Sequence, residues 1–219
     1  MIDYKQKYLK YKTKYNNLKN NFYFIHNTSS IKTLISILKK GKILLGSDVK
    51  EDERKHSGGK PMDYIFGHIY FEDLKNLSNT QDFAIILHPK IIKKYDIIFN
   101  KGWQAGPGDP KYKRSIQLLK SDDVNTRNIK ITQIRKFLKN PHADPNISYI
   151  PPNEFLQHEV VFDKPILLKD NIIGIICLLC DTVDDRKKYF DKLQNIINEK
   201  YPNVKFYKSN AMPLLKDLL

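Results

Sequence analysis

The chain has 219 residues, of which 41% are hydrophobic and 28% charged, and its formal net charge is +14 at pH 7. These values are typical of a soluble globular domain with an appendage. The longest apolar run, Ile172 to Cys180, is far shorter than the roughly 20 residues that a membrane span requires. Neither the apolar core of a signal peptide nor enough cysteine for a disulfide framework is present. We therefore expect an intracellular protein that is not secreted and has no transmembrane segment.

The net charge is the strongest feature of the composition. A surface this basic attracts polyanions through counterion release and steers phosphate-bearing ligands toward it. The alternative is that the charge provides solubility within a composition rich in Lys, Asn and Ile. Charge alone therefore favours a nucleic-acid partner but does not identify one.

Residues 1–20 differ from the rest of the chain and form the first of two predicted units, the second being residues 21–219. Lysines dominate this segment, and apolar-bodied residues recur at heptad spacing, namely Tyr4, Tyr8, Tyr11, Tyr15 and Leu18. The pattern predicts a basic amphipathic helix whose tyrosine face packs on the domain or on a second copy, giving a homodimer. Binding to nucleic acid or to an acidic membrane surface is the alternative. The wording KYLKYKTKY resembles leaders of giant-virus proteins, which implies a host cytoplasm or a virion as the location.

The segment from Phe22 to Gly41 organises the remainder. Its aromatic and β-branched start predicts a buried strand, and His26 stands where that strand ends. Thr28, Ser29 and Ser30 are candidate N-caps for a helix whose apolar residues recur at helical spacing. Gly41 is the predicted C-terminal stop of that helix.

The later segments mix strands and helices without regular alternation. Strands are predicted over 64–74, 83–87, 97–99, 155–162, 171–179 and 204–207, and helices over 115–139 and 184–200. The polar tracts 47–63, 102–114 and 141–152 are predicted loops, and the second carries the only tryptophan, Trp103. The order favours an α+β fold over a doubly wound sheet.

Three residues stand at predicted strand ends or within short motifs. His26 lies in His-Asn-Thr, Tyr70 in Gly-His-Ile-Tyr-Phe, and Glu159 in Gln-His-Glu-Val-Val-Phe. This order resembles the His-Tyr-Glu class of the ADP-ribosyltransferase superfamily. The run from His26 to Gly41 is also similar to the DarT-like transferases that modify DNA. Asn27 stands where the class has glycine, and His68 interrupts its Gly-Ile-Tyr.

The resemblance implies a split mixed β-sheet, NAD as substrate, and transfer of ADP-ribose to nucleic acid or protein. Glu159 would be the catalytic residue, and His26, Thr28, Tyr70 and Gln157 would bind the cofactor. The tract 47–63 would cover NAD, and 141–157 would meet the acceptor. Cleavage of the nicotinamide–ribose bond passes through an oxocarbenium-like state, which a carboxylate beside the ribose can stabilise.

Simpler interpretations exist for each site residue. His26 could cap the adjacent helix, Tyr70 could be a core aromatic, and Glu159 could be a salt-bridged structural glutamate. A non-catalytic nucleic-acid-binding module and a nucleotide-dependent RNA-processing transferase are the alternative functions. The histidines show no metal-ligand spacing, and Cys177 and Cys180 lack a second pair, so we expect no metal and two inert core cysteines.

Overall fold

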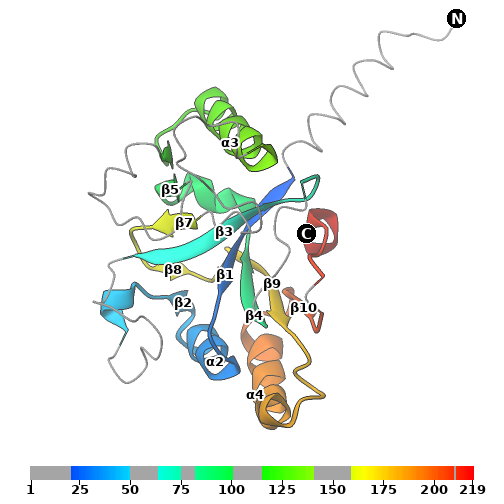
Figure 1. The fold of residues 1–219 in the computed structure, drawn as a ribbon. Helices are drawn as coiled ribbons and strands as arrows, with labels where there is room; N and C mark the ends of the chain where they lie inside the picture. The colour runs from blue at the N-terminus through cyan, green and yellow to red at the C-terminus, as the bar shows by residue number, and fades with distance from the viewer. Residues whose placement is uncertain (1–20, 50–63, 75–81, 101–114, 141–158, 210) are drawn as a thin grey trace, which may run out of the picture.

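The computed structural model describes residues 21–49, 64–74, 82–100, 115–140, 159–209 and 211–219 (Figure 1). The predicted helix over 1–20, most of the tract 47–63 and the loops 102–114 and 141–152 lie outside these residues, as does Gln157. Within the described ranges, no helix is long and apolar enough to cross a bilayer.

A large mixed sheet forms the centre of the domain. Its strands, with a separate short pair, are β1 (Phe22–Asn27), β2 (Lys42–Ile43), β3 (Ile65–Phe71), β4 (Phe83–Leu87), β5 (Ile97–Asn100), β6 (Ile116–Leu118), β7 (Glu159–Phe162), β8 (Ile166–Leu167), β9 (Ile172–Cys177) and β10 (Lys205–Tyr207). The sheet has 8 strands in the order β10-β9-β4-β1-β3-β7-β5-β6, and β2 pairs only with β8. All neighbours are antiparallel except β9 and β10. The predicted α+β class with a mixed sheet is confirmed.

The helices are α2 (Ile31–Lys40), α3 (Val124–Lys139), α4 (Asp184–Lys200) and the short α5 (Leu215–Leu218), with 3₁₀ turns η1 (Gly46–Asp48) and η3 (Pro89–Lys93). The predicted caps of α2 are confirmed. The Oγ of Ser30 accepts a hydrogen bond from the amide of Thr33 at 3.1 Å. Gly41 ends the helix in the left-handed region, at φ 68°, where a side chain would be strained.

The two faces of the sheet are covered differently. The main core includes the inward residues of α2, α3 and α4, packed on Phe24, Ile69 and Phe162 of the sheet. A second core on the other face joins Tyr23, Ile25 and Tyr70 to the C-terminal residues Leu215 and Leu218. Figure 1 shows α2 and α4 together at one end of the molecule, with α3 at the other. The sheet is therefore enclosed by helices on one face and partly by the chain end on the other.

One predicted helix is wrong in its first part. The segment 115–139 begins with β6 and a turn, and α3 starts only at Val124, capped by the carboxylate of Asp123. Ile129 is 59% exposed, although its neighbour Ile131 is buried. Arg127 occupies the inward position instead and donates to the carbonyl oxygens of Lys120 and Asp122. The segment 115–139 was predicted as one helix, whereas the turn at 119–123 separates β6 from α3.

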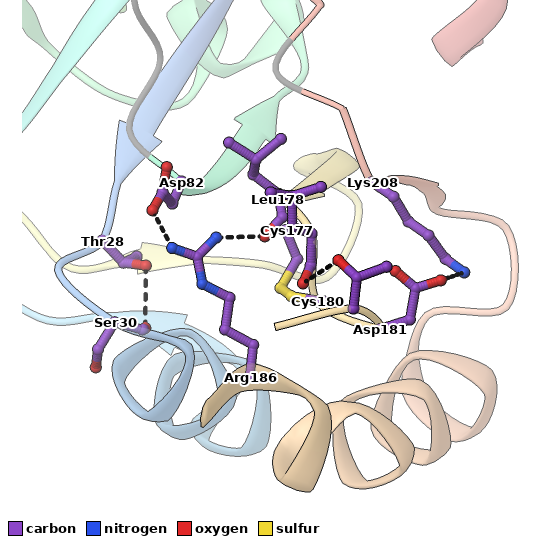
Figure 2. The surroundings of a disulfide bond; sticks show 11 residues. Thr28, Ser30, Asp82, Cys177, Leu178, Cys180, Asp181, Arg186 and Lys208 are labelled. Carbon is purple, nitrogen blue, oxygen red and sulfur yellow. Dashed lines mark hydrogen bonds and ion pairs between the residues drawn. A yellow bond between two sulfur atoms is a disulfide. The ribbon is translucent and has the colours of Figure 1, made fainter. Parts of the chain in front are cut away.

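The two cysteines lie at the end of β9. Both are fully buried, as predicted for core cysteines, and their sulfur atoms form a disulfide that the sequence analysis did not predict. Figure 2 shows Arg186 of α4 reaching this turn, where it donates to the carbonyl oxygen of Leu178 at 2.5 Å and pairs with Asp82. The start of α4 is thus attached to the ends of β9 and β4.

Candidate functional site

Strands β1 and β7 pair with opposite edges of β3, and both pairings end at Gly67 and His68. On one edge, β1 pairs with β3 from Phe71 to His68. On the other edge, β7 pairs with it from Ile65 to Gly67. Beyond His68, β1 turns away and continues beside β4 alone. The sheet therefore divides at Gly67 and His68, and the site described below lies around this division.

Gly67 marks a close approach of two backbones. A Cβ atom at this position would lie 2.7 Å from the carbonyl oxygen of Ile25, closer than atoms can pack. Glycine inside a strand often marks a close approach of a ligand or another backbone, and here the neighbour is the backbone of Ile25. Glycine thus allows β1 to stay against β3 up to the point where the two strands separate.

His26 lies where β1 leaves β3. Its half-buried ring places Nδ1 2.8 Å from the carbonyl oxygen of Phe66, a backbone acceptor that β1 leaves unpaired. Burial lowers the pKa of His26 below its ordinary value of 6.5, and the nearby His68 lowers it further, while the bond to Phe66 opposes both effects. The ring is therefore neutral at pH 7. Because a carbonyl oxygen only accepts, Nδ1 carries the proton and Nε2 is left as an acceptor.

Glu159 begins β7 and is 6% exposed. Its strand neighbours Val160 and Phe162 point into the main core, so alternation directs Glu159 to the opposite face. Asn100, the last residue of β5, is its direct cross-strand partner and is 2% exposed. His68 belongs to the same face, since it pairs with Ile25 of the second core. We call Glu159, Asn100 and His68 the polar face.

His26 and Glu159 stand on the two edges of β3. The register places His26 level with Gly67, and Gly67 is paired with Val160, the residue next to Glu159. His26 and Glu159 thus lie on the two strands that flank β3, near the division of the sheet. Alternation assigns His26 to the face of Phe24 and Glu159 to the opposite face, so they approach the division from different sides of the sheet.

The other predicted cofactor residues have different surroundings. Tyr70 is 5% exposed and packs on Tyr23, with ring centroids 5.1 Å apart, under the C-terminal residues. It shares the face of Glu159 but lies farther along β3 than His68. Thr28 is buried in the turn into α2, where its Oγ1 donates to the carbonyl oxygen of Ser30 at 3.4 Å. Gln157 lies outside the described residues.

Two asparagines of this region were not selected from the sequence. Among the described residues, neither Oδ1 of Asn27 nor Nδ2 of Asn100 has a hydrogen-bond partner, although both atoms are buried. Asn27 ends β1 beside His26, and Asn100 ends β5 beside Glu159. The signal that could have revealed Asn100 is a polar amide directly after the apolar run Ile97–Phe99. Buried polar atoms are nearly always satisfied, so these exceptions point to a ligand.

The described residues of the site offer oxygen and nitrogen groups. Among the described residues, no cluster of His, Cys, Asp or Glu could hold a metal ion. The polar face instead provides a carboxylate and an amide, and His26 provides a neutral ring. Together these groups can bind hydroxyls and stabilise a developing positive charge.

Comparison with known proteins identifies relatives. The model of a family of unknown function, DUF5846, matches residues 19–141, which include His26, Tyr70 and Asn100 but end before Glu159. The protein named "Uncharacterized protein R11" of Acanthamoeba polyphaga mimivirus is 41% identical over 235 residues, covering 99% of this chain and 85% of the relative. A relative from a giant virus agrees with the resemblance of the leader.

Several solved structures show a more distant likeness. Thermus sp. 2.9 DarT in complex with carba-NAD+ is 13% identical, with a TM-score of 0.47 over 88% of this chain and 97% of that chain. The same protein in complex with ADP-ribosylated ssDNA is 14% identical, with a TM-score of 0.45 over 86% and 94%. No residue role is carried over from these structures. The match of the family model and the extent of the mimivirus relative show that this chain belongs to the DUF5846 family.

Proposed function

We propose that this protein is an NAD-dependent ADP-ribosyltransferase that transfers ADP-ribose to a macromolecule. The observation that carries the proposal is the placement of Glu159, a buried carboxylate at the head of β7, across β3 from His26. A carboxylate buried in a strand is costly to remove from water. The occurrence of His26, Tyr70 and Glu159 in the order of the His-Tyr-Glu class indicates that the carboxylate functions in ADP-ribosyl transfer.

Glu159 acts at the ribose that carries nicotinamide. The bond between this ribose and nicotinamide breaks, and its electron pair leaves with nicotinamide. Positive charge then develops on the sugar, and Glu159, which accepts a hydrogen bond from the adjacent hydroxyl, binds the sugar more tightly. The acceptor's nucleophilic atom forms the new bond and loses its proton. Removing one such preorganised group typically costs a factor of about 10²–10³ in rate.

His26 positions the dinucleotide. Its Nε2 accepts a hydrogen bond from a ribose hydroxyl on the adenine side, while the bond from Nδ1 to Phe66 fixes the ring. Tyr70 packs against Tyr23, so any contact with NAD involves the ring edge that this packing leaves uncovered. Thr28 acts on the cofactor indirectly, since its hydroxyl is used in the turn that follows His26.

The acceptor that the charge favours is nucleic acid. Exposed lysines lie at the ends of α2 and α4, in η3 and beside β8, namely Lys39, Lys42, Lys90, Lys93, Lys94, Lys164, Lys169 and Lys200, and the exposed acids among them are Asp163, Asp170 and Glu199. We call these lysines the basic surface. Backbone hydrogen bonds join the segments that carry these lysines. The amide of Leu168 donates to the carbonyl oxygen of Gly41 at 2.9 Å, and the amide of His88 donates to the carbonyl oxygen of Asn171 at 2.7 Å. Such a surface binds phosphates without reading sequence.

The exposed lysines of the basic surface also support a second candidate function, which is that of a nucleic-acid-binding module without enzymatic turnover. A module of this kind would use the basic surface alone and would leave Glu159 as a structural residue. Protein remains the alternative acceptor if the enzyme is active. The two functions differ in one measurable quantity, which is the release of nicotinamide from NAD.

The test is incubation of the purified full chain with NAD labelled in the adenine moiety, together with single-stranded DNA, RNA or cell-extract protein. We expect nicotinamide release and transfer of label to nucleic acid by the wild type. The Glu159→Gln variant should lose turnover by a factor of about 10² or more and keep NAD affinity within a few fold. Equal turnover by both proteins would remove Glu159 from the mechanism, and no turnover by the wild type would leave the binding module.

A further inference from the structure

Asn100 is a buried polar residue on the strand next to that of Glu159. The two residues are direct cross-strand partners of β5 and β7, so their side chains stand side by side on one face. Asn100 is 2% exposed, and its Nδ2 has no hydrogen-bond partner in the described part of the chain. A buried N–H₂ group that donates to nothing destabilises a fold, because it loses its hydrogen bonds to water without replacement.

Among the described residues, nothing accepts a hydrogen bond from the amide nitrogen of Asn100. The preceding side chain, Phe99, packs into the main core with Phe137, with ring centroids 5.8 Å apart, and holds the end of β5. Leucine has the same branched shape as asparagine with larger methyl groups, and it carries no polar atom that would need a partner at residue 100. Asn171 differs in its amide nitrogen, which donates to the carbonyl oxygen of Leu167 at 2.7 Å, while its Oδ1 is also buried without a partner among the described residues.

We propose that Asn100 is a substrate-binding residue whose Nδ2 donates to the same ribose hydroxyl that donates to Glu159. The assignment rests on the proposed function and extends it to a residue that the resemblance does not include. An ionised carboxylate only accepts hydrogen bonds, and an amide nitrogen only donates them. A hydroxyl does both, so an adjacent pair of this kind is complementary to one sugar hydroxyl.

The bond from Asn100 strengthens during the reaction. As positive charge develops on the sugar, the hydroxyl gives its proton more fully to Glu159 and its oxygen becomes a better acceptor. The amide N–H then stabilises that oxygen more in the transition state than in bound NAD. Loss of the amide should consequently reduce kcat more than it raises KM.

The first measurement is thermal stability of the unliganded full chain. The Asn100→Leu variant should melt at a temperature equal to or higher than that of the wild type, because it removes an unpartnered donor. The matched control Asn171→Leu should melt at a lower temperature, because it breaks the bond to Leu167. A lower melting temperature for Asn100→Leu would mean that the amide is satisfied within the fold, which overturns the proposal.

The second measurement is steady-state release of nicotinamide from NAD. For Asn100→Leu we expect kcat to fall by a factor of about 10², as for other preorganised donors, with KM changed only a few fold. Asn171→Leu should keep both constants near those of the wild type below its melting temperature. With an NAD analogue that lacks the hydroxyl beside the reacting carbon, the wild type and Asn100→Leu should become similar.

The outcomes separate the two proposals. An active wild type with unchanged constants in Asn100→Leu would overturn only the role of Asn100. A wild type that releases no nicotinamide would overturn the transferase function together with it. Parallel loss of activity in the Asn171→Leu control would also count against a specific role for the Asn100 amide.

Discussion

The Nδ1 atom of His26 lies 2.8 Å from the carbonyl oxygen of Phe66, across the gap that opens where β1 leaves β3. The bond compensates for a ladder hydrogen bond that the division of the sheet removes. It also fixes the ring in one tautomer, since a carbonyl oxygen requires a donor. One contact therefore serves the fold and prepares Nε2 of His26 as an acceptor for a ligand.

The pH dependence of stability should reveal His26. Its pKa is lower in the folded protein than in the unfolded chain, so the unfolded chain binds more protons between these two values. Stability should therefore fall as the pH falls below about 6.5, which is the unfolded pKa of His. Melting temperatures of the wild type and His26→Gln, measured between about pH 8 and 5, should show a smaller decline for the variant.

His88 has to be separated from His26 in that experiment. Its pKa is lowered too, by burial first and then by Lys90 and Lys94, and its Nδ1 accepts from the amide of Lys90 at 2.9 Å. His88→Gln and the double variant should therefore be measured beside His26→Gln. A decline that disappears in His88→Gln and persists in His26→Gln would contradict the assignment to His26.

Gly67 should not tolerate a side chain. Alanine at this position would place Cβ 2.7 Å from the oxygen of Ile25, and that oxygen belongs to backbone that cannot move without separating β1 from β3. We expect Gly67→Ala to reduce the free energy of unfolding by about 1–3 kcal/mol, measured by urea denaturation. Gly174→Ala is the comparison, since its Cβ would meet only side-chain atoms, namely Cδ2 of Leu218, Cδ1 of Ile86 and, at 3.3 Å, Cβ of Ile86, so it should cost less than a clash with backbone. Equal losses in both variants would mean that the backbone contact is not limiting.

Local signals in the sequence were sufficient for most of the fold. The caps of α2 and the bounds of α4 follow from hydroxyls, glycine and apolar spacing that act within a few residues. The strand β6 was missed because Ile116 and Leu118 fit a helical window as well as an alternating one. Asp123, the N-cap of α3, was the signal for the correct start of the helix.

The site was less accessible to sequence reasoning, because its geometry depends on register. Tyr70 was selected as a nicotinamide contact, but pairing with β1 places it on Tyr23 beneath residues from the end of the chain. Asn100 was overlooked, because it gains its proposed role only by pairing with Glu159, and residues 101–158 separate the two in the sequence. No local pattern encodes either relationship.

The C-terminal residues should be required for stability. Tyr23 donates to the carbonyl oxygen of Pro213 at 2.9 Å, and the amide of Leu215 donates to Glu72. Burial raises the pKa of Tyr23, so the phenol stays protonated and able to donate. Tyr23→Phe should cost about 1 kcal/mol, as for one buried hydrogen bond. Deletion of residues 211–219 should cost more, because it also exposes the second core, and urea denaturation would measure both.

The basic surface should control binding to nucleic acid. Replacing Lys90, Lys93 and Lys94 with Gln removes positive charge from one exposed part of it without disturbing the buried residues Ile91 and Ile92. If three phosphate contacts are lost, affinity for single-stranded DNA should fall, and the slope of log K against log salt should decrease by about 2, at roughly 0.7 per contact. The control replaces exposed lysines on other elements, Lys136, Lys139 and Lys205, and should leave the slope nearly unchanged. Fluorescence anisotropy between about 50 and 200 mM salt measures the slope. A wild-type affinity insensitive to salt would contradict a nucleic-acid partner at this surface and would direct the search for the acceptor toward protein.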